Sequence, residues 1–419
     1  MRGGGNVKPG HVQALVLAAL VLMAACAGCT GGGTGPVDTT APENGYRTVV
    51  DSRGVAVQVP THIERVVTVS DGLVEGAMVA LGVDETLVGL GSSCIQRDWT
   101  YSYPLDDGGQ VNESGGCNIL QVLSPSVKSL PLVMESGVAM NYETLTSLNP
   151  DVVILRLGCC SLQSKDDEMT QRTINAIESL GIPLIVLYSP NCYNQPDLHM
   201  ISDEIAILGQ VFEKEDEAKR LAEYLESQVA FVNERTRDVT ELEQPTVLIF
   251  GLSPKHRTEG AAGTAHGLRT TESYMIEEIV HAKNAFRSDT GNFQILNTEM
   301  ILALDPDVIV LCTAWGYHPP GELYDATYYK NLRELRAVKN HQVMSLPWTP
   351  CNCAKRLEYP IDVMVIAKAA YPERFADVDL AEWLLEFYEN VYGVDRATAE
   401  SLRSAQWMDW CVVECPTCG

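Results

Sequence analysis

Short apolar runs rich in β-branched residues alternate along the chain with longer amphipathic stretches, a pattern typical of an α/β fold. The apolar runs predict buried strands, and the stretches between them, such as Leu73–Leu81 and Thr173–Leu180, predict helices. The expected strands are Arg65–Ser70, Leu87–Leu90, Val152–Leu155, Leu184–Leu187, Val247–Phe250, Val308–Leu311 and Val343–Leu346.

One predicted helix, Glu215–Asp238, is much longer than the others. Its apolar residues recur at helical spacing, at Ala218, Leu221, Leu225, Val229 and Val232. At about 1.5 Å per residue it would extend roughly 36 Å, enough to connect two lobes. We therefore expect an N-terminal α/β lobe at 46–213, a connecting helix at 214–240, a C-terminal α/β lobe at 241–405 and a Cys-rich tail at 406–419.

An internal repeat supports two lobes. Tyr142–Leu155 reads YETLTSLNPDVVIL, and Thr298–Leu311 reads TEMILALDPDVIVL. Each copy predicts a helix that ends before Pro-Asp and leads into a buried strand. Any helix–turn–strand junction could look similar, but copies on both sides of the long helix favour duplicated or convergent lobes.

The first 28 residues read as a lipoprotein signal peptide. Arg2 and Lys8 precede the apolar run Ala14–Ala25, which is too short to span a bilayer. Small residues then precede Cys29, the expected lipidation site; Cys26 is the second choice, and simple cleavage and secretion is the alternative. Residues 29–45 are rich in Gly, Thr and Pro and predict a flexible tether.

The charge balance argues against nucleic acid as a partner. Lys plus Arg total 30 against 55 Asp plus Glu, a formal net charge of −25, and such a field repels phosphate backbones. The composition, 46% hydrophobic and 20% charged, is that of a globular protein with a substantial core. The charge says less about small ligands, because one cleft can carry its own local charge.

Several segments together resemble the ABC-transporter substrate-binding lipoproteins for iron chelates, cobalamin and haem. They are the D-x-x-G-x-x-V-x-V-P hairpin at 51–60, the E-R-V-V strand at 64–67, the helix ending in A-L-G at 80–82, the long mid-chain helix and the closing segment 355–393. The resemblance implies two Rossmann-like lobes joined by a long rigid helix, the class III periplasmic-binding-protein fold. It also implies a ligand held between the lobes, with no catalysis and no required cofactor.

The resemblance further implies where the protein acts and with what. It would be anchored on the outer face of the cytoplasmic membrane through its N-terminal lipid and would deliver its cargo to ABC permease and ATPase subunits. One acidic residue of each lobe would dock on the permease. Glu143 and Glu299 occupy matching places in the repeat; the alternative is that each only stabilises the start of its helix.

Ligands in parallel α/β lobes bind beyond the carboxyl ends of the strands, so the cleft residues should follow each strand. Lys255, His256, Arg257 and His266 could form a positive patch or an exposed loop, and Trp315, Tyr317 and Trp348 could stack on a planar ring or pack in the core. The candidate ligand-binding residues are Asp71, Ser92, Cys94, Ser136, Cys159, Cys160, Cys192, Tyr193, Lys255, His256, Arg257, Trp315, Tyr317, Trp348, Cys351 and Cys353.

Cysteines are concentrated in these loops, where Cys312 also falls. Three interpretations stay open: disulfides between neighbouring loops, thiolate ligation of a soft metal by Cys159, Cys160, Cys351 and Cys353, or unpaired thiols. Cys159 and Cys160 are adjacent, so each should have a different partner.

The favoured function is capture of an iron chelate, corrinoid, haem or thiolate-ligated metal as cargo for an importer. The alternative is a protein of the same fold that holds a metal or iron–sulfur centre permanently through cleft cysteines, as a sensor or electron carrier. An enzyme is disfavoured, since the sequence has neither the H-E-x-x-H zinc motif nor the phosphate-binding G-x-x-x-x-G-K-[ST] motif.

Overall fold

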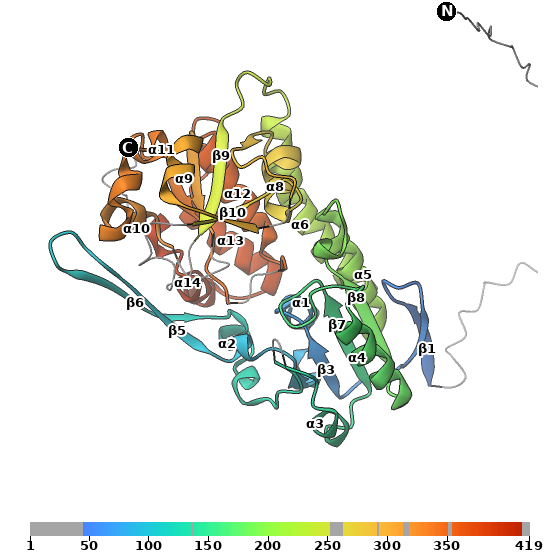
Figure 1. The fold of residues 1–419 in the computed structure, drawn as a ribbon. Coiled ribbons are helices and arrows are strands. Elements are labelled where there is room, and N and C mark those ends of the chain that lie inside the picture. The colour runs from blue at the N-terminus through green and yellow to red at the C-terminus, as the bar shows by residue number, and fades with distance from the viewer. Residues whose placement is uncertain are drawn as a thin grey trace, which may run out of the picture. The chain divides into compact units, whose positions relative to one another are not determined.

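Two β-sheets, separated in sequence by the long helix α6 (Glu215–Thr236), organise the chain (Figure 1). The computed structural model describes residues 45–135, 138–251, 263–290, 293–312, 318–350 and 354–412, and residues 44–419 form one compact unit. The predicted α/β class, with two lobes joined by a long helix, is confirmed.

The first sheet is parallel throughout, in the order β4–β3–β7–β8. Nearly all of its residues are buried, because helices and loops cover both faces of such a sheet. The four predicted strands of this lobe are confirmed, with β7 extending two residues further than expected. The strands are β3 (Val66–Val69), β4 (Leu87–Leu90), β7 (Val152–Leu157) and β8 (Leu184–Tyr188).

The second sheet is mixed. Its parallel part, β9–β13–β14 with β11 on β9, continues on the other side of β9 into two antiparallel strands, in the order β12–β10–β9–β13–β14. The three strands predicted in this half are confirmed. The strands are β9 (Thr246–Gly251), β10 (Gly263–His266), β11 (Lys283–Asn284), β12 (Phe293–Leu296), β13 (Val308–Leu311) and β14 (Val343–Ser345).

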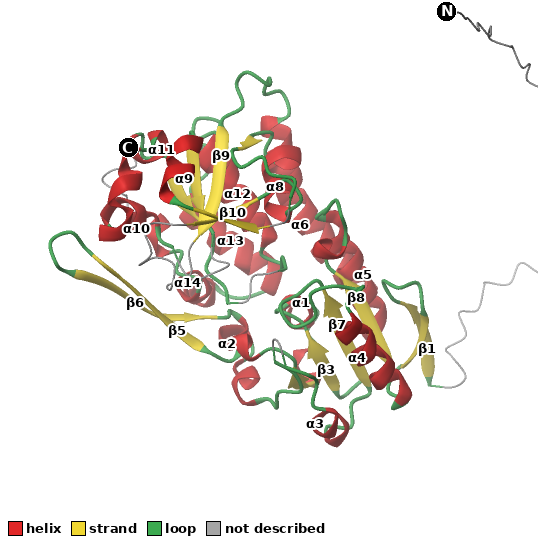
Figure 2. Ribbon diagram, in the orientation of Figure 1, coloured by secondary structure: helices red, strands yellow, loops and turns green. Residues whose placement is uncertain are grey.

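Helices fill the connections (Figure 2). In the first half they are α1 (Leu73–Ala80), α2 (Leu120–Leu123), α3 (Tyr142–Ser147), α4 (Glu168–Ser179) and α5 (His199–Phe212). In the second half they are α8 (Thr271–Tyr274), the π-helix Met275–Ile279, α9 (Thr298–Leu304), α10 (Pro320–Asp325), the 3-10 helix Thr327–Glu334, α11 (Arg336–Lys339), α12 (Tyr359–Ala370), α13 (Leu380–Tyr392) and α14 (Arg396–Ala405). None of the helices in the described ranges has both the length and the apolar character needed to cross a membrane.

Helix α4 begins five residues earlier than the apolar pattern predicts. The side chain of Asp167 accepts a hydrogen bond from the Thr170 backbone N–H and so caps the first turn. The first turn itself is mostly exposed, which is why the apolar periodicity did not include it.

Helix α6 lies against α5 and α12 and contributes to one core that is continuous across both lobes. Its buried residues Ala218, Leu221, Leu225 and Val232 recur at the spacing that predicted the helix. The same core contains the inner faces of β3 and β7 and those of β9 and β13. The connector is therefore packed along its length rather than suspended between the lobes.

The internal repeat has the same structure in both lobes. Helix α3 precedes β7 and helix α9 precedes β13, and the turn between each pair contains one residue in the left-handed region, Asn149 with φ 44° and Asp305 with φ 36°. Asn and Asp tolerate this conformation better than other non-glycine residues do. The following proline cannot continue a helix, so the turn ends each helix at the same place.

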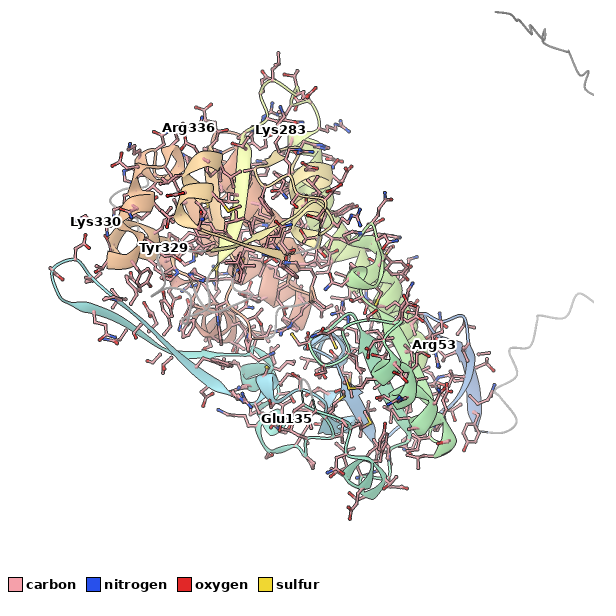
Figure 3. The ribbon with its side chains drawn as sticks, in the orientation of Figure 1. Arg53, Glu135, Lys283, Tyr329, Lys330 and Arg336 are labelled. Atoms are coloured by element: carbon pink, nitrogen blue, oxygen red, sulfur yellow. The ribbon has the colours of Figure 1, made fainter. Side chains whose placement is uncertain are left out.

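The aspartate after that proline aligns the neighbouring strand in both copies. Asp151 Oδ2 accepts from the Arg65 backbone N–H at 2.9 Å, just before β3, and Asp307 Oδ2 accepts from that of Thr246 at 2.9 Å, at the start of β9. Asp307 Oδ1 also pairs with Arg336, labelled in Figure 3. In each lobe the aspartate of the repeated Pro-Asp thus fixes the register of two parallel strands, β3 with β7 and β9 with β13.

A long hairpin leaves the first lobe and reaches the second. Its strands are β5 (Asp98–Pro104) and β6 (Gln110–Cys117), and a shorter hairpin, β1 (Tyr46–Val50) with β2 (Ala56–Pro60), lies near the start of the described chain. At the tip, Leu105 forms an isolated antiparallel bridge with Ala326, and Asp106 forms an ion pair with Arg333 at 2.5 Å. This hairpin was not predicted.

An aromatic cluster holds the base of the long hairpin against the second lobe. The Trp407 ring packs against Trp348 and Tyr101, with ring centroids 4.6 Å and 6.4 Å apart, and its Nε1–H donates to the Ser114 carbonyl at 3.2 Å. Trp99 completes the cluster by an edge contact with Trp348. A side chain at Gly116 would place its Cβ 2.4 Å from the Trp407 ring, so only glycine fits there.

We expect Gly116→Ala to detach the hairpin from Trp407 and to lower the free energy of unfolding by about 1–3 kcal/mol, since overpacking forces rings or backbone to shift. Gln110→Ala, at an exposed position of the same hairpin, is the control and should change little. Thermal and denaturant unfolding measure both variants. A Gly116→Ala protein as stable as the control would contradict the contact.

Candidate functional site

Residues that follow the strands of the first lobe converge at one edge of its sheet, as predicted. Asp71, after β3, is fully buried, and its Oδ2 accepts from the Cys160 backbone N–H at 2.8 Å. Ser161, after β7, donates to the Gly91 carbonyl, next to Ser92. The loops after three strands are thereby joined, with Ser92 and Cys159 buried among them.

Burial raises the pKa of Asp71 to about 6, against the lowering effect of its backbone hydrogen bond and of Arg356 and Arg156. Its second oxygen, Oδ1, is buried without a hydrogen-bond partner among the described residues. Position 72 favours glycine for two reasons. Its φ of 113° lies in the left-handed region, and a Cβ there would lie only 3.1 Å from the Arg356 Nε.

The cysteines of this edge divide into two states. Cys94 and Cys160 are disulfide-bonded, so in this state their sulfurs are not available as metal ligands. Cys159 and Cys192 are free thiols, and burial raises the pKa of both, that of Cys192 to about 11. The expectation that Cys159 and Cys160 would each have a different partner is therefore met only for Cys160, because Cys159 is a free thiol.

Two other predicted residues lie at the margins. Tyr193 is more than one-third exposed and makes an edge contact with Tyr188, with the Lys165 ammonium 5.1 Å from its ring. Trp348 is 3% exposed in the aromatic cluster, the packing role that had been left open for it. Ser136, Lys255, His256, Arg257, Trp315, Tyr317, Cys351 and Cys353, together with Cys26 and Cys29, lie outside the described residues.

A buried ion pair, not predicted, lies within the first lobe and makes a hydrogen bond to the second. Arg156 in β7 has no exposed surface, and its guanidinium holds Glu204 of α5 through two hydrogen bonds of 2.6 and 2.8 Å. Its third contact, 2.7 Å, goes to the backbone carbonyl of Lys355 in the other lobe. The Lys355 ammonium lies between Glu272 at 2.9 Å and Asp362 at 2.7 Å.

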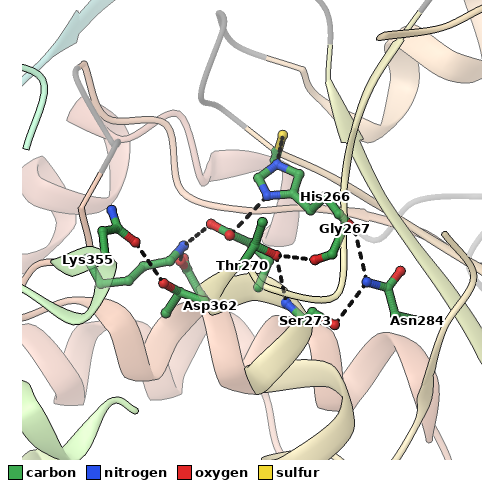
Figure 4. A network of polar contacts seen from close by, with 11 residues as sticks. His266, Gly267, Thr270, Ser273, Asn284, Lys355 and Asp362 are labelled. Carbon is green, nitrogen blue, oxygen red and sulfur yellow. Dashed lines mark hydrogen bonds and ion pairs between the residues drawn. The ribbon is translucent and has the colours of Figure 1, made fainter. Parts of the chain in front are cut away.

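This chain of charges continues to a histidine and a thiol (Figure 4). The second oxygen of Glu272 lies 2.9 Å from His266 Nδ1, and His266 Nε2 lies 3.3 Å from the Cys312 sulfur. Burial alone would lower the pKa of His266, but Glu272 and Cys312 raise it to about 10. Burial alone would raise the pKa of Glu272, but Lys355 and His266 hold it well below its usual range.

A cavity of about 640 Å³ lies beside this network, between the lobes. The first lobe lines it with the loop after β8 and the start of α5, including Asp197 and Met200; the second contributes Arg269, Tyr274, Glu277 and Glu278. Hydrogen bonds also cross between the lobes here: the Thr271 hydroxyl donates to Asn191 Oδ1 and the Tyr274 hydroxyl donates to Asp197 Oδ1, both at 3.1 Å.

Part of this buried charge network could have been predicted from the sequence. Arg156 interrupts an otherwise apolar strand, VVILRL, and a charge there indicates a buried pair. Lys355 and Arg356 come two and three residues after Cys353, the last residue of the loop that was expected to face the cleft. Glu272 carried no signal, since it lies in a short helix whose position depends on the second sheet.

Asp71 should make stability depend on pH. Because its pKa is about 6 in the folded protein and near 3.8 when unfolded, its protonated form favours folding. The free energy of unfolding should therefore fall by up to about 3 kcal/mol as pH rises from 4 to 7. Asp71→Asn should reduce that decline, whereas Asn at the exposed Asp289 should not. Denaturant unfolding across this range measures the slope, and equal slopes would refute the assignment.

Known proteins match the chain in sequence and in fold. It matches the periplasmic binding protein family over residues 81–349. The molybdate-binding protein MolA of Haemophilus influenzae is 22% identical over 366 residues, 83% of this chain and 91% of that protein.

Two solved structures show the same fold. A periplasmic solute-binding protein of Veillonella parvula superposes with a TM-score of 0.66 at 19% identity, over 88% of this chain and 99% of that one. Helicobacter pylori CeuE in a nickel–histidine complex gives 0.59 at 16% identity, over 85% and 98%. The predicted resemblance is thus confirmed: the chain belongs to the periplasmic binding protein family, as the substrate-binding component of an ABC importer.

Proposed function

We propose that the protein captures a metal chelate or metallocofactor, such as an iron chelate, a corrinoid or haem, between its lobes. The cavity lined by both lobes carries the proposal. Its volume of about 640 Å³ lies within the range of roughly 300–1,000 Å³ usual for small-molecule sites. A bare oxyanion such as molybdate, the ligand in the name of the relative MolA, would leave most of this space unfilled.

The charges of the site support the same choice. Among the described residues, the cavity wall carries three carboxylates, Asp197, Glu278 and Glu277, the last paired with Arg287, and one guanidinium, that of Arg269. The nearby buried cations Arg156 and Lys355 are already paired with carboxylates. An oxyanion would meet a negative wall, whereas a complex with a positive metal centre would be attracted to it.

Titration with four probes tests the cargo class: a ferric catecholate, haemin, cyanocobalamin and molybdate, followed by tryptophan fluorescence. One of the three metal complexes should bind saturably with sub-micromolar affinity, and molybdate should not. Exclusive binding of molybdate would contradict the proposal. A metal that co-purifies stoichiometrically and survives dialysis would instead favour the sensor or electron-carrier alternative.

Delivery, as we propose it, uses a lipid anchor on Cys29 and two docking carboxylates, with ABC permease and ATPase subunits as partners. Glu143 and Glu299 are exposed, each the second residue of its helix, α3 and α9. An asparagine caps each helix, Asn141 and Asn297, by accepting from a backbone N–H. Because capping is supplied by asparagine, the glutamates are left available for another role.

The double variant Glu143→Lys with Glu299→Lys should abolish uptake of the cargo that the titration identifies, since it reverses the charge of both docking points. Cargo affinity should stay unchanged, because both residues are exposed and neither lines the cavity. Whole-cell uptake and fluorescence titration measure the two effects. Lysine at the exposed Glu64 and Glu334 is the matched control. Normal uptake by the double variant would remove these glutamates from the mechanism.

A further inference from the structure

Three exposed apolar residues lie beside one of the two proposed docking carboxylates. Phe293 and Ile295 in β12 are 46% and 58% exposed, and Met300 in α9 is 46% exposed. Glu299 belongs to the same short segment, 293–300. Single exposed apolar side chains are ordinary, but several together mark a surface that meets a partner. We call Phe293, Ile295 and Met300 the apolar patch.

The second sheet holds this patch in place without covering it. Side chains alternate along a strand, so Phe293 and Ile295 lie on one face of β12, while Leu296, only 1% exposed, lies on the other. The β12 strand is at the end of the described strand order, next to β10. The Phe293 ring makes an edge contact with His266 of β10 and stays nearly half exposed beside it.

Comparison of the two copies of the repeat shows that the fold does not require the patch. The copies also match just before their helices, where each has a buried apolar residue followed by the capping asparagine. At the positions of Ile295 and Met300, however, the first lobe has Ala139 and Thr144. Large apolar side chains are therefore not needed to form this element, and their exposure in the second lobe indicates a contact with another molecule.

The permease of the importer suits the patch better than a second copy of this chain does. A stable dimer buries roughly 800 Å² on each partner, far more than three side chains supply. The chain belongs to a family of importer components, and Glu299, the proposed docking residue of this lobe, lies within the patch segment. Among the described residues between α2 and α3, which precede Glu143 in the first lobe, Val138 is the only large apolar residue that is exposed.

We propose that Phe293, Ile295 and Met300 pack against an apolar surface of the permease and exclude water from the ion pair that Glu299 makes there. This inference rests on the proposed function and specifies its docking surface on the second lobe. An ion pair exposed to water and salt contributes little to binding. Apolar neighbours that exclude water strengthen the pair, and their own burial adds a contribution that salt does not screen.

The double variant Ile295→Thr with Met300→Gln tests the patch, since threonine suits a strand and glutamine suits a helix. Binding to the importer's permease and ATPase subunits, held in lipid nanodiscs, is measured at low and at high salt. We expect binding to weaken by at least about tenfold and to become more sensitive to salt. Val50→Thr with Leu242→Gln, at positions 51% and 97% exposed outside the patch, is the matched control and should bind as the parent protein does.

Methionine oxidation tests the patch in the unmutated protein and so covers a variant that fails to fold. The bound importer should slow the oxidation of Met300 by peroxide several-fold, because the docked side chain is buried. Met169 of α4, 40% exposed outside the patch, should oxidise equally with and without the importer. Equal oxidation of Met300 in the two states, or binding of the double variant at the parent's strength, would overturn the proposal.

The same assay separates failure of this inference from failure of the proposed function. If Glu143→Lys with Glu299→Lys abolishes binding to the importer while Ile295→Thr with Met300→Gln leaves it intact, the docking glutamates stand and only the patch assignment fails. If neither double variant changes binding, the docking proposal fails as well. A parent protein that sediments as a dimer, with a monomeric Ile295→Thr, Met300→Gln variant, would assign the patch to a contact between copies and overturn the inference.

Discussion

The buried guanidinium of Arg156 determines how the two lobes meet. Arg156 lies within a parallel strand and has no exposed surface, so its charge must be compensated internally. Glu204 compensates the charge within the first lobe, and the Lys355 carbonyl of the second lobe accepts a hydrogen bond from Nη1. Lys355 then needs its own carboxylates, Glu272 and Asp362. Removing any member would leave a buried charge uncompensated, so the group is expected to be retained or lost as a unit.

Local patterning was sufficient to predict the scaffold. The seven apolar runs became largely buried strands, and their short length and β-branched residues had distinguished them from buried helices. Helix α6 could be predicted because its buried residues are spaced along one face. The repeat could be recognised because each Pro-Asp stands between a helix and a strand, where the aspartate binds the neighbouring strand. In each case the pattern that allowed the prediction is local in the sequence or recurs periodically, even where the contact it makes, as for Asp151 and Asp307, is distant.

What escaped prediction depends on contacts distant in sequence. The long hairpin, DWTYSYP in its first strand, alternates buried and exposed residues, yet its buried face is covered by Trp407 and Trp348, about 300 and 250 residues away. Placing cleft residues after each strand located Asp71, Cys159 and Cys160 correctly at one edge. That rule could not reveal that His266 and Cys312, each noted separately, would meet, since their contact exists only once β9 lies between them.

The long hairpin has a mechanical consequence. One helical connector would leave two bodies able to twist about its axis even if it prevented them from separating. The ion pair at the hairpin tip and the tryptophan at its base add attachment points away from that axis, and a body held at points that do not lie on one line resists torsion. The hairpin therefore opposes rotation of one lobe against the other, in addition to the contacts that Arg156 and Tyr274 make across the lobes.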